Sequence, residues 1–149
     1  MNTCEFSSEV ERLRGRPCYI MDFLPARVPP NAGGQFYNVE NYILGHMDEL
    51  GLRARITGVL LKLMCYCRVN TDWNGWRETP SPELVANAVK ELLTSRSGTL
   101  NLLLPDDDAL VVFEWDCMNI SVYNPSENIK NLLSAIASSE NLSWRRAIK

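Results

Sequence analysis

Three short apolar runs, separated by two brief polar turns, constrain the fold of this chain more than any other feature of its sequence. The runs extend from Leu100 to Leu104, from Leu110 to Trp115 and from Ile120 to Tyr123. A connection of only a few residues joins strands that lie side by side and run in opposite directions. The runs therefore predict a three-stranded antiparallel meander.

A helix is expected immediately after this meander. The segment from Asn124 to Glu127 matches a capping box, with Asn124 at the N-cap and Glu127 at the third helical position. The apolar residues that follow recur at helical spacing, and they are Ile129, Leu132, Leu133 and Ile136. The meander and the helix together predict one compact unit at the C-terminal end.

The first third of the chain predicts one helix, one strand and a loop. Residues 1–16 are expected to form a short amphipathic helix with Val10 and Leu13 as its apolar contacts, and residues 18–23 a first strand. Residues 25–35 are rich in Pro and Gly and should form a loop. At the other end of the chain, residues 142–146 are expected to form a tail that packs on the domain through Leu142 and Trp144.

Apolar residues at helical spacing predict helices in the middle of the chain. A helix is expected from Phe36 to Leu50, with Gly51 as its left-handed stop, and another from Pro82 to about Ser95 with Ser81 as its cap. Residues 56–69 fit both a helix and a strand, and the length of the run favours a buried helix that ends in extended chain. The predicted fold is α+β, an antiparallel sheet packed with about four helices.

The chain has the size of one domain, covering residues 1–149. Its five cysteines are odd in number and lack the spacing of a disulfide framework, which indicates reduced thiols and a cytoplasmic location. No secretory signal is recognisable at the N-terminus. The most apolar segment, from Val59 to Cys67, is far shorter than the roughly 20 residues that span a bilayer, so no membrane partner is expected.

Charge is distributed unevenly along the sequence. Between Ser97 and Ile129 there are six acidic residues and neither Lys nor Arg. This interval has a formal charge of −6 against −3 for the whole chain, which leaves +3 for the remainder. An acidic face on the meander is expected, and a polyanionic nucleic acid is disfavoured as a partner.

The acidic residues and two tryptophans are the candidate partner-binding residues. Asp106, Asp107 and Asp108 could be a solvated turn, a protein-binding surface or a metal site, but their spacing is not that of an EF-hand. Glu114 and Asp116 flank an aromatic residue near the next turn, where acids beside aromatic side chains suit a basic partner. Further aromatic anchors could be Trp73 and Trp76, for which core packing is the simpler interpretation.

Catalytic motifs are missing from the sequence. His46 is the single histidine, no serine lies in a GxSxG elbow, and no GxxxxGK or GxGxxG segment is present. Cys65 and Cys67 form a CxC pair without a second pair nearby, so neither a metal nor another cofactor is expected. The alternative is an enzyme or small-ligand-binding protein with a pocket formed by the 25–35 loop, His46 and the Trp73–Trp76 segment.

One resemblance covers roughly the last third of the chain. Phe113 to Asp116, Ile120 to Pro125, the amphipathic helix and Leu142 to Arg145 together resemble the ends of small bacterial immunity proteins that accompany polymorphic or contact-dependent toxins. The resemblance implies a cytoplasmic, non-enzymatic protein that neutralises a cognate toxin domain by binding it. Nuclease toxins are commonly basic because they hold phosphates, so an acidic inhibitor face would match them.

Overall fold

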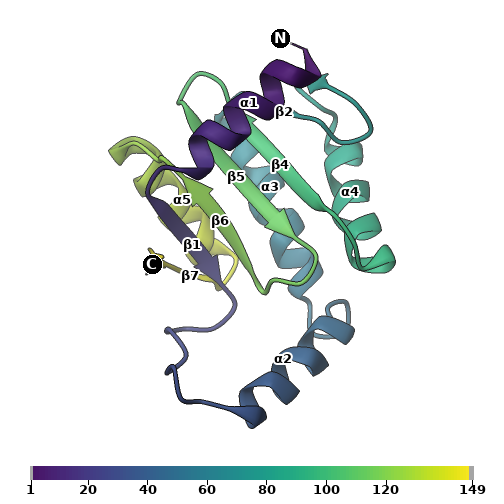
Figure 1. Cartoon of the computed structure of the whole chain (residues 1–149), viewed down its shortest axis with the longest axis vertical. Coiled ribbons are helices and arrows are strands. Elements are labelled where there is room, and N and C mark those ends of the chain that lie inside the picture. Colours follow the sequence, from purple (N-terminus) through teal and green to yellow (C-terminus); the bar gives the residue numbers. More distant parts are fainter. Residues whose placement is uncertain (1, 148–149) are drawn as a thin grey trace.

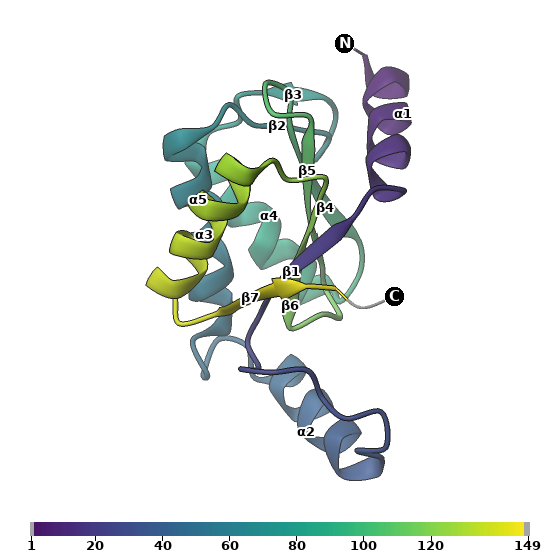
Figure 2. The same cartoon turned by 90° about the vertical axis from the view of Figure 1, so that its left-hand side faces the viewer.

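The computed structural model describes residues 2–147 as an antiparallel sheet with helices on both faces. Helix α1 lies on one face, and α3, α4 and α5 lie on the other (Figures 1 and 2). The helices are α1 (Thr3–Arg14), α2 (Gly34–Gly45), α3 (Leu52–Tyr66), α4 (Pro82–Ser95) and α5 (Glu127–Ser139). The α+β class is confirmed, with five helices in the described part of the chain rather than about four.

Seven strands form the sheet in the order β3-β2-β4-β5-β6-β1-β7 within the described residues. Their bounds are β1 (Cys18–Asp22), β2 (Asn70–Thr71), β3 (Arg77–Glu78), β4 (Thr99–Leu104), β5 (Ala109–Glu114), β6 (Asn119–Tyr123) and β7 (Ser143–Arg146). The predicted meander is present as β4, β5 and β6, in a register that places Val111 opposite both Leu102 and Val122.

The expected C-terminal tail is a strand rather than an irregular segment. Met21 of β1 lies opposite Trp144 of β7, so β1 is sandwiched between β6 and the end of the chain. The predicted docking is confirmed, because Leu142 is buried and the ring of Trp144 stacks on Tyr19 with centroids 5.4 Å apart. Four residues are too few for a periodic signal to distinguish a strand from a docked tail.

Burial explains why the strands differ in sequence. The main core lies between the sheet and helices α3, α4 and α5, and a smaller cluster lies under α1, where Phe6 and Leu13 pack on Leu103, Leu110 and Val112. Strand β5 is covered on both faces and is almost continuously apolar, whereas β6 alternates between buried and half-buried residues. One face of β6 is therefore left partly open.

The end predicted for the second helix is wrong. Helix α2 ends at Gly45 rather than at Leu50, because Met47 turns inward and its carbonyl accepts from the amides of Leu52 and Arg53. Gly51, at a φ of 75°, then precedes α3 instead of closing α2. The favoured interpretation of residues 56–69, a buried helix that ends in extended chain, is confirmed, because α3 is helical as far as Tyr66 and Cys67 then has an extended backbone.

The N-cap predicted for α5 is likewise wrong by two residues. Ser126 is the cap, and its Oγ accepts from the backbone N–H of Ile129 at 3.3 Å. Asn124 has a φ of 61°, and its Nδ2 donates to the backbone oxygen of Asp108 at 2.8 Å. A contact with a turn distant in sequence thus removes Asn124 from the capping position.

Candidate partner-binding surface

The acidic residues of the meander lie in two separate places. Asp106, Asp107 and Asp108 occupy the turn between β4 and β5, whereas Glu114 and Asp116 lie at the turn between β5 and β6. Strand β5 has six residues, so the two turns are separated by roughly 20 Å. The structure does not gather the acidic interval into one continuous face.

Arginines from distant parts of the chain offset the charge of the first group. Arg68 donates to both carboxylate oxygens of Asp106 at 2.7 and 3.2 Å and lowers the pKa of that carboxyl group. Arg12 of α1 pairs with Asp108, and the hydrogen bonds that Arg12 donates to Glu9 and Asp108 raise its pKa. Two of the three carboxylates in this turn therefore have a cationic partner within the protein.

Both candidate tryptophans have packing contacts. Trp76 lies 5.0 Å from Phe6 between ring centroids, in the cluster under α1, and Trp73 packs against the main core. They belong to the hairpin of β2 and β3, whose strands of two residues each were not predicted from the sequence. Each remains half-exposed, so their role as anchors stays a prediction.

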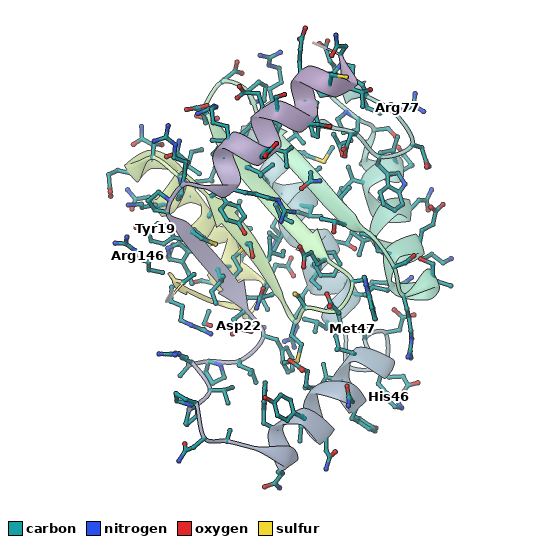
Figure 3. The ribbon with its side chains drawn as sticks, in the orientation of Figure 1. Tyr19, Asp22, His46, Met47, Arg77 and Arg146 are labelled. Atoms are coloured by element: carbon teal, nitrogen blue, oxygen red, sulfur yellow. The ribbon has the colours of Figure 1, made fainter. Side chains whose placement is uncertain are left out.

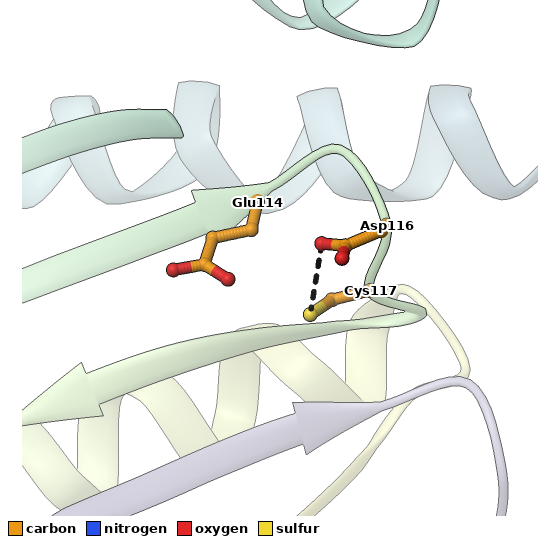
Figure 4. Close-up of side chains that lie close together, drawn as sticks. All are labelled: Glu114, Asp116 and Cys117. Atoms are coloured by element: carbon orange, nitrogen blue, oxygen red, sulfur yellow. Dashed lines mark hydrogen bonds between the residues drawn. The ribbon is translucent and has the colours of Figure 1, made fainter. Parts of the chain in front are cut away.

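The turn between β5 and β6 has a different electrostatic character. Side-chain atoms of Glu114, Asp116 and Cys117 lie within 4.8 Å of one another, and the Cys117 thiol donates to Asp116 Oδ1 at 3.8 Å (Figure 4). Burial, together with the negative charges of Asp116, Glu114 and Glu40, raises the pKa of Cys117 to about 12. Arg14 Nη1 lies 3.7 Å from Oε1 of Glu114.

These three side chains form the one group in the described chain that offers three potential metal-ligand atoms together. Soft metals bind the thiolate rather than the thiol. The raised pKa keeps Cys117 protonated at neutral pH, so the charge of this group lies on its carboxylates. We call Glu40, Glu114 and Asp116 the carboxylate cluster.

The protonated state of Cys117 predicts its reactivity. Iodoacetamide attacks the thiolate, so alkylation of Cys117 at pH 8 should be on the order of a hundredfold slower in the folded protein than in urea. Replacing Asp116 by Asn should accelerate the reaction, because one of the charges that disfavours the thiolate is removed. Mass spectrometry of each cysteine measures both rates, and equal rates in folded and unfolded protein would contradict the assignment.

Helix α2 adds a surface that the sequence analysis did not identify. It projects from the end of the molecule beyond the β5–β6 turn (Figures 1 and 2), and Ile43 is its one buried residue. Tyr37, Val39 and Tyr42 are 61%, 49% and 57% exposed. Val39 shares the helical spacing of Phe36 and Ile43, which favours burial, yet it is exposed. Tyr37 and Tyr42 lie outside that stripe, and they are the sequence signal for an exposed surface.

His46 lies just past the C-terminal end of α2 (Figure 3) and lines a small groove of about 230 Å³. The other lining residues include Asp48, Arg53, Lys90 and Arg96, and none comes from residues 25–35 or from the Trp73–Trp76 segment. Small-molecule sites usually have volumes of about 300–1,000 Å³. The structure does not bring together the residues that the enzyme or small-ligand alternative requires.

No protein-family model, curated protein or solved structure matches this chain. Within residues 2–147, none of the helices combines the length and the apolar character needed to cross a bilayer. What the chain does is therefore inferred from its own residues.

Proposed function

We propose that this chain is a non-enzymatic binding protein of the immunity or antitoxin type, which acts in the cytoplasm and neutralises a cognate toxin domain by direct binding. The observation that supports this most is the convergence of Glu40, Glu114 and Asp116 on Cys117, at the end of the molecule from which α2 projects. Carboxylates gathered around one thiol favour a basic partner.

A nuclease toxin fits this charge. Its active site must hold phosphates and is therefore lined with Lys and Arg, and the carboxylate cluster offers these groups a competing set of anions. Steering by opposite charges also speeds the encounter, which matters for an inhibitor that must act before its toxin does. Asp107 and the half-exposed tryptophans would then lie outside the central contact.

Co-expression tests this function. The toxin domain encoded by a neighbouring reading frame is induced in cells with and without this chain, and survival is counted. We expect the chain to restore growth and to co-purify in fixed stoichiometry with an inactivated form of that domain. Absence of a toxin-like frame beside the gene, or unchanged killing at equal expression, would contradict the function.

A further inference from the structure

Helix α2 has the weakest support of the helices in the described chain. Its N-cap, Gly33, has a φ of 72° and makes no side-chain hydrogen bond, its first turn has no acidic residue and its last turn no basic one. Helices α1, α4 and α5 each have a capping side chain and an acid in the first turn. Helix α3 also lacks a cap, but it buries five residues, whereas Ile43 is the one buried residue of α2. Helix α2 thus lacks both the local and the tertiary support that the others have.

The helix propensity of α2 does not compensate for this. Its twelve residues begin and end with glycine and include two asparagines, two tyrosines and a valine, all of which favour a helix less than alanine does. An isolated helix shorter than about 12–15 residues is marginally stable in water. Folding of α2 therefore depends on the packing of Phe36, Ile43 and Leu44 against the main core.

No hydrogen bond or ion pair in the described chain joins α2 to the sheet. The hydrogen bonds, ion pairs and ring contacts of residues 34–46 link them to one another or to Gly33, Glu49 and Leu50. Figures 1 and 2 show α2 standing away from the layers that the sheet forms with α3, α4 and α5. Apolar packing along one side is therefore what holds the helix in place.

The chain is fixed at one point before α2 and at another after it. Before the helix, Ser143 Oγ donates to the backbone oxygen of Leu24 at 2.7 Å. After the helix, Met47 is buried and its carbonyl accepts from two amides at the start of α3. Between these points, the 25–35 segment is almost entirely exposed. A segment that is anchored at its ends and weakly packed between them opens at a lower free energy than the core does.

We infer that residues 25–46 form a flap, hinged at Leu24 and Met47, which unfolds and refolds as a unit while the sheet and the other helices stay folded. The weak caps and the sparse packing of α2 make the open state accessible, and the two anchors limit the opening to this segment. The inference concerns the free chain and stands apart from the proposed function.

The flap controls the composition of the carboxylate cluster. Glu40 is half-buried on α2 and lies close enough to Cys117 to raise the pKa of its thiol. Opening of the flap takes Glu40 away and leaves Glu114 and Asp116 on the sheet. Under the proposed function, a basic partner that pairs with all three carboxylates would favour the closed flap.

Hydrogen exchange of the free protein tests the flap. We expect the amides from Asn38 to Gly45 to share nearly one protection factor, about a hundredfold lower than that of amides in the middle of α3. Asn38→Ala/Asn41→Ala places a better helix former at two exposed positions of α2, so exchange of these amides should slow about tenfold.

The matched control is Asn87→Ala/Asn131→Ala, the same replacement at exposed positions inside α4 and α5. It stabilises helices that stay folded when the flap opens, so α2 should exchange at its wild-type rate while the most protected core amides slow. If both variants slow α2 equally, the helix opens only with the whole domain and the inference is overturned. Protection of α2 equal to that of α3 would overturn it as well. Because no partner enters the experiment, either result leaves the proposed function to its own test.

Discussion

Replacing Arg145 by alanine is expected to lower the free energy of unfolding by about 3 kcal/mol, because it leaves a buried carboxylate without its partner. Arg145 Nη2 lies 2.5 Å from Oδ2 of Asp22, whose side chain is 7% accessible. Oδ1 of Asp22 accepts from the backbone N–H of Leu24 at 3.2 Å, and this bond remains in the variant. The ion pair links β1 to β7, so its loss should also loosen the edge of the sheet. Urea denaturation followed by tryptophan fluorescence measures the change.

Arg146→Ala is the matched control for this variant. Arg146 is the next residue of the same strand and is exposed, so its removal should change the stability by less than about 0.5 kcal/mol. A double-mutant cycle with Asp22→Ala and Arg145→Ala isolates the pair, and we expect the double variant to lose less than the two single variants combined. Equal losses for Arg145→Ala and Arg146→Ala would show that the pair contributes nothing.

Neutralising the carboxylate cluster is expected to slow association with the toxin domain about tenfold. Glu114→Gln/Asp116→Asn keeps the shapes of both side chains and removes two charges, of which Glu114 is paired with Arg14 at 3.7 Å. Electrostatic steering acts mainly on the association rate, so the salt dependence of that rate should also become shallower. Stopped-flow measurements at several ionic strengths give both quantities.

The corresponding control neutralises the other acidic turn. Asp106→Asn/Asp108→Asn removes the same number of charges, but these carboxylates pair with Arg68 and Arg12 within the chain. Neutralising them also frees those arginines, so association with a basic partner should slow less than threefold at low salt. A larger effect here than for Glu114 and Asp116 would place the partner on the β4–β5 turn instead.

The meander was predictable because its strands are joined by short turns and covered by helices, so pattern and packing agree. The hairpin of β2 and β3 and the strand β7 could not be predicted, because elements of two to four residues show no periodic pattern. They form by pairing with distant strands, β2 opposite Leu103 and β7 opposite Met21. The N-cap of α5 failed for a related reason. Asn124 and Ser126 are comparable capping residues, but the side chain of Asn124 is bound to the backbone oxygen of Asp108, which leaves Ser126 as the cap.

For the site, the sequence predicted the net charge of the interval but not which of its carboxylates are paired. The sequence contains six acids in one interval, yet the cations that neutralise part of it come from positions 12 and 68, more than 30 residues away in the chain. Equally, the proximity of Glu40 to Cys117 depends on how the 25–35 loop returns the chain to the end of the sheet. Tertiary structure therefore decides which carboxylates remain available to a partner.

Hydrogen exchange of this chain, alone and bound to the inactivated toxin domain, tests the central claim most directly. The claim predicts that binding slows exchange at residues 34–47 and 114–119, while residues 105–108 and the outer face of α3 and α5 exchange as in the free protein. Protection confined to the β4–β5 turn and the β2–β3 hairpin, with α2 unchanged, would contradict it.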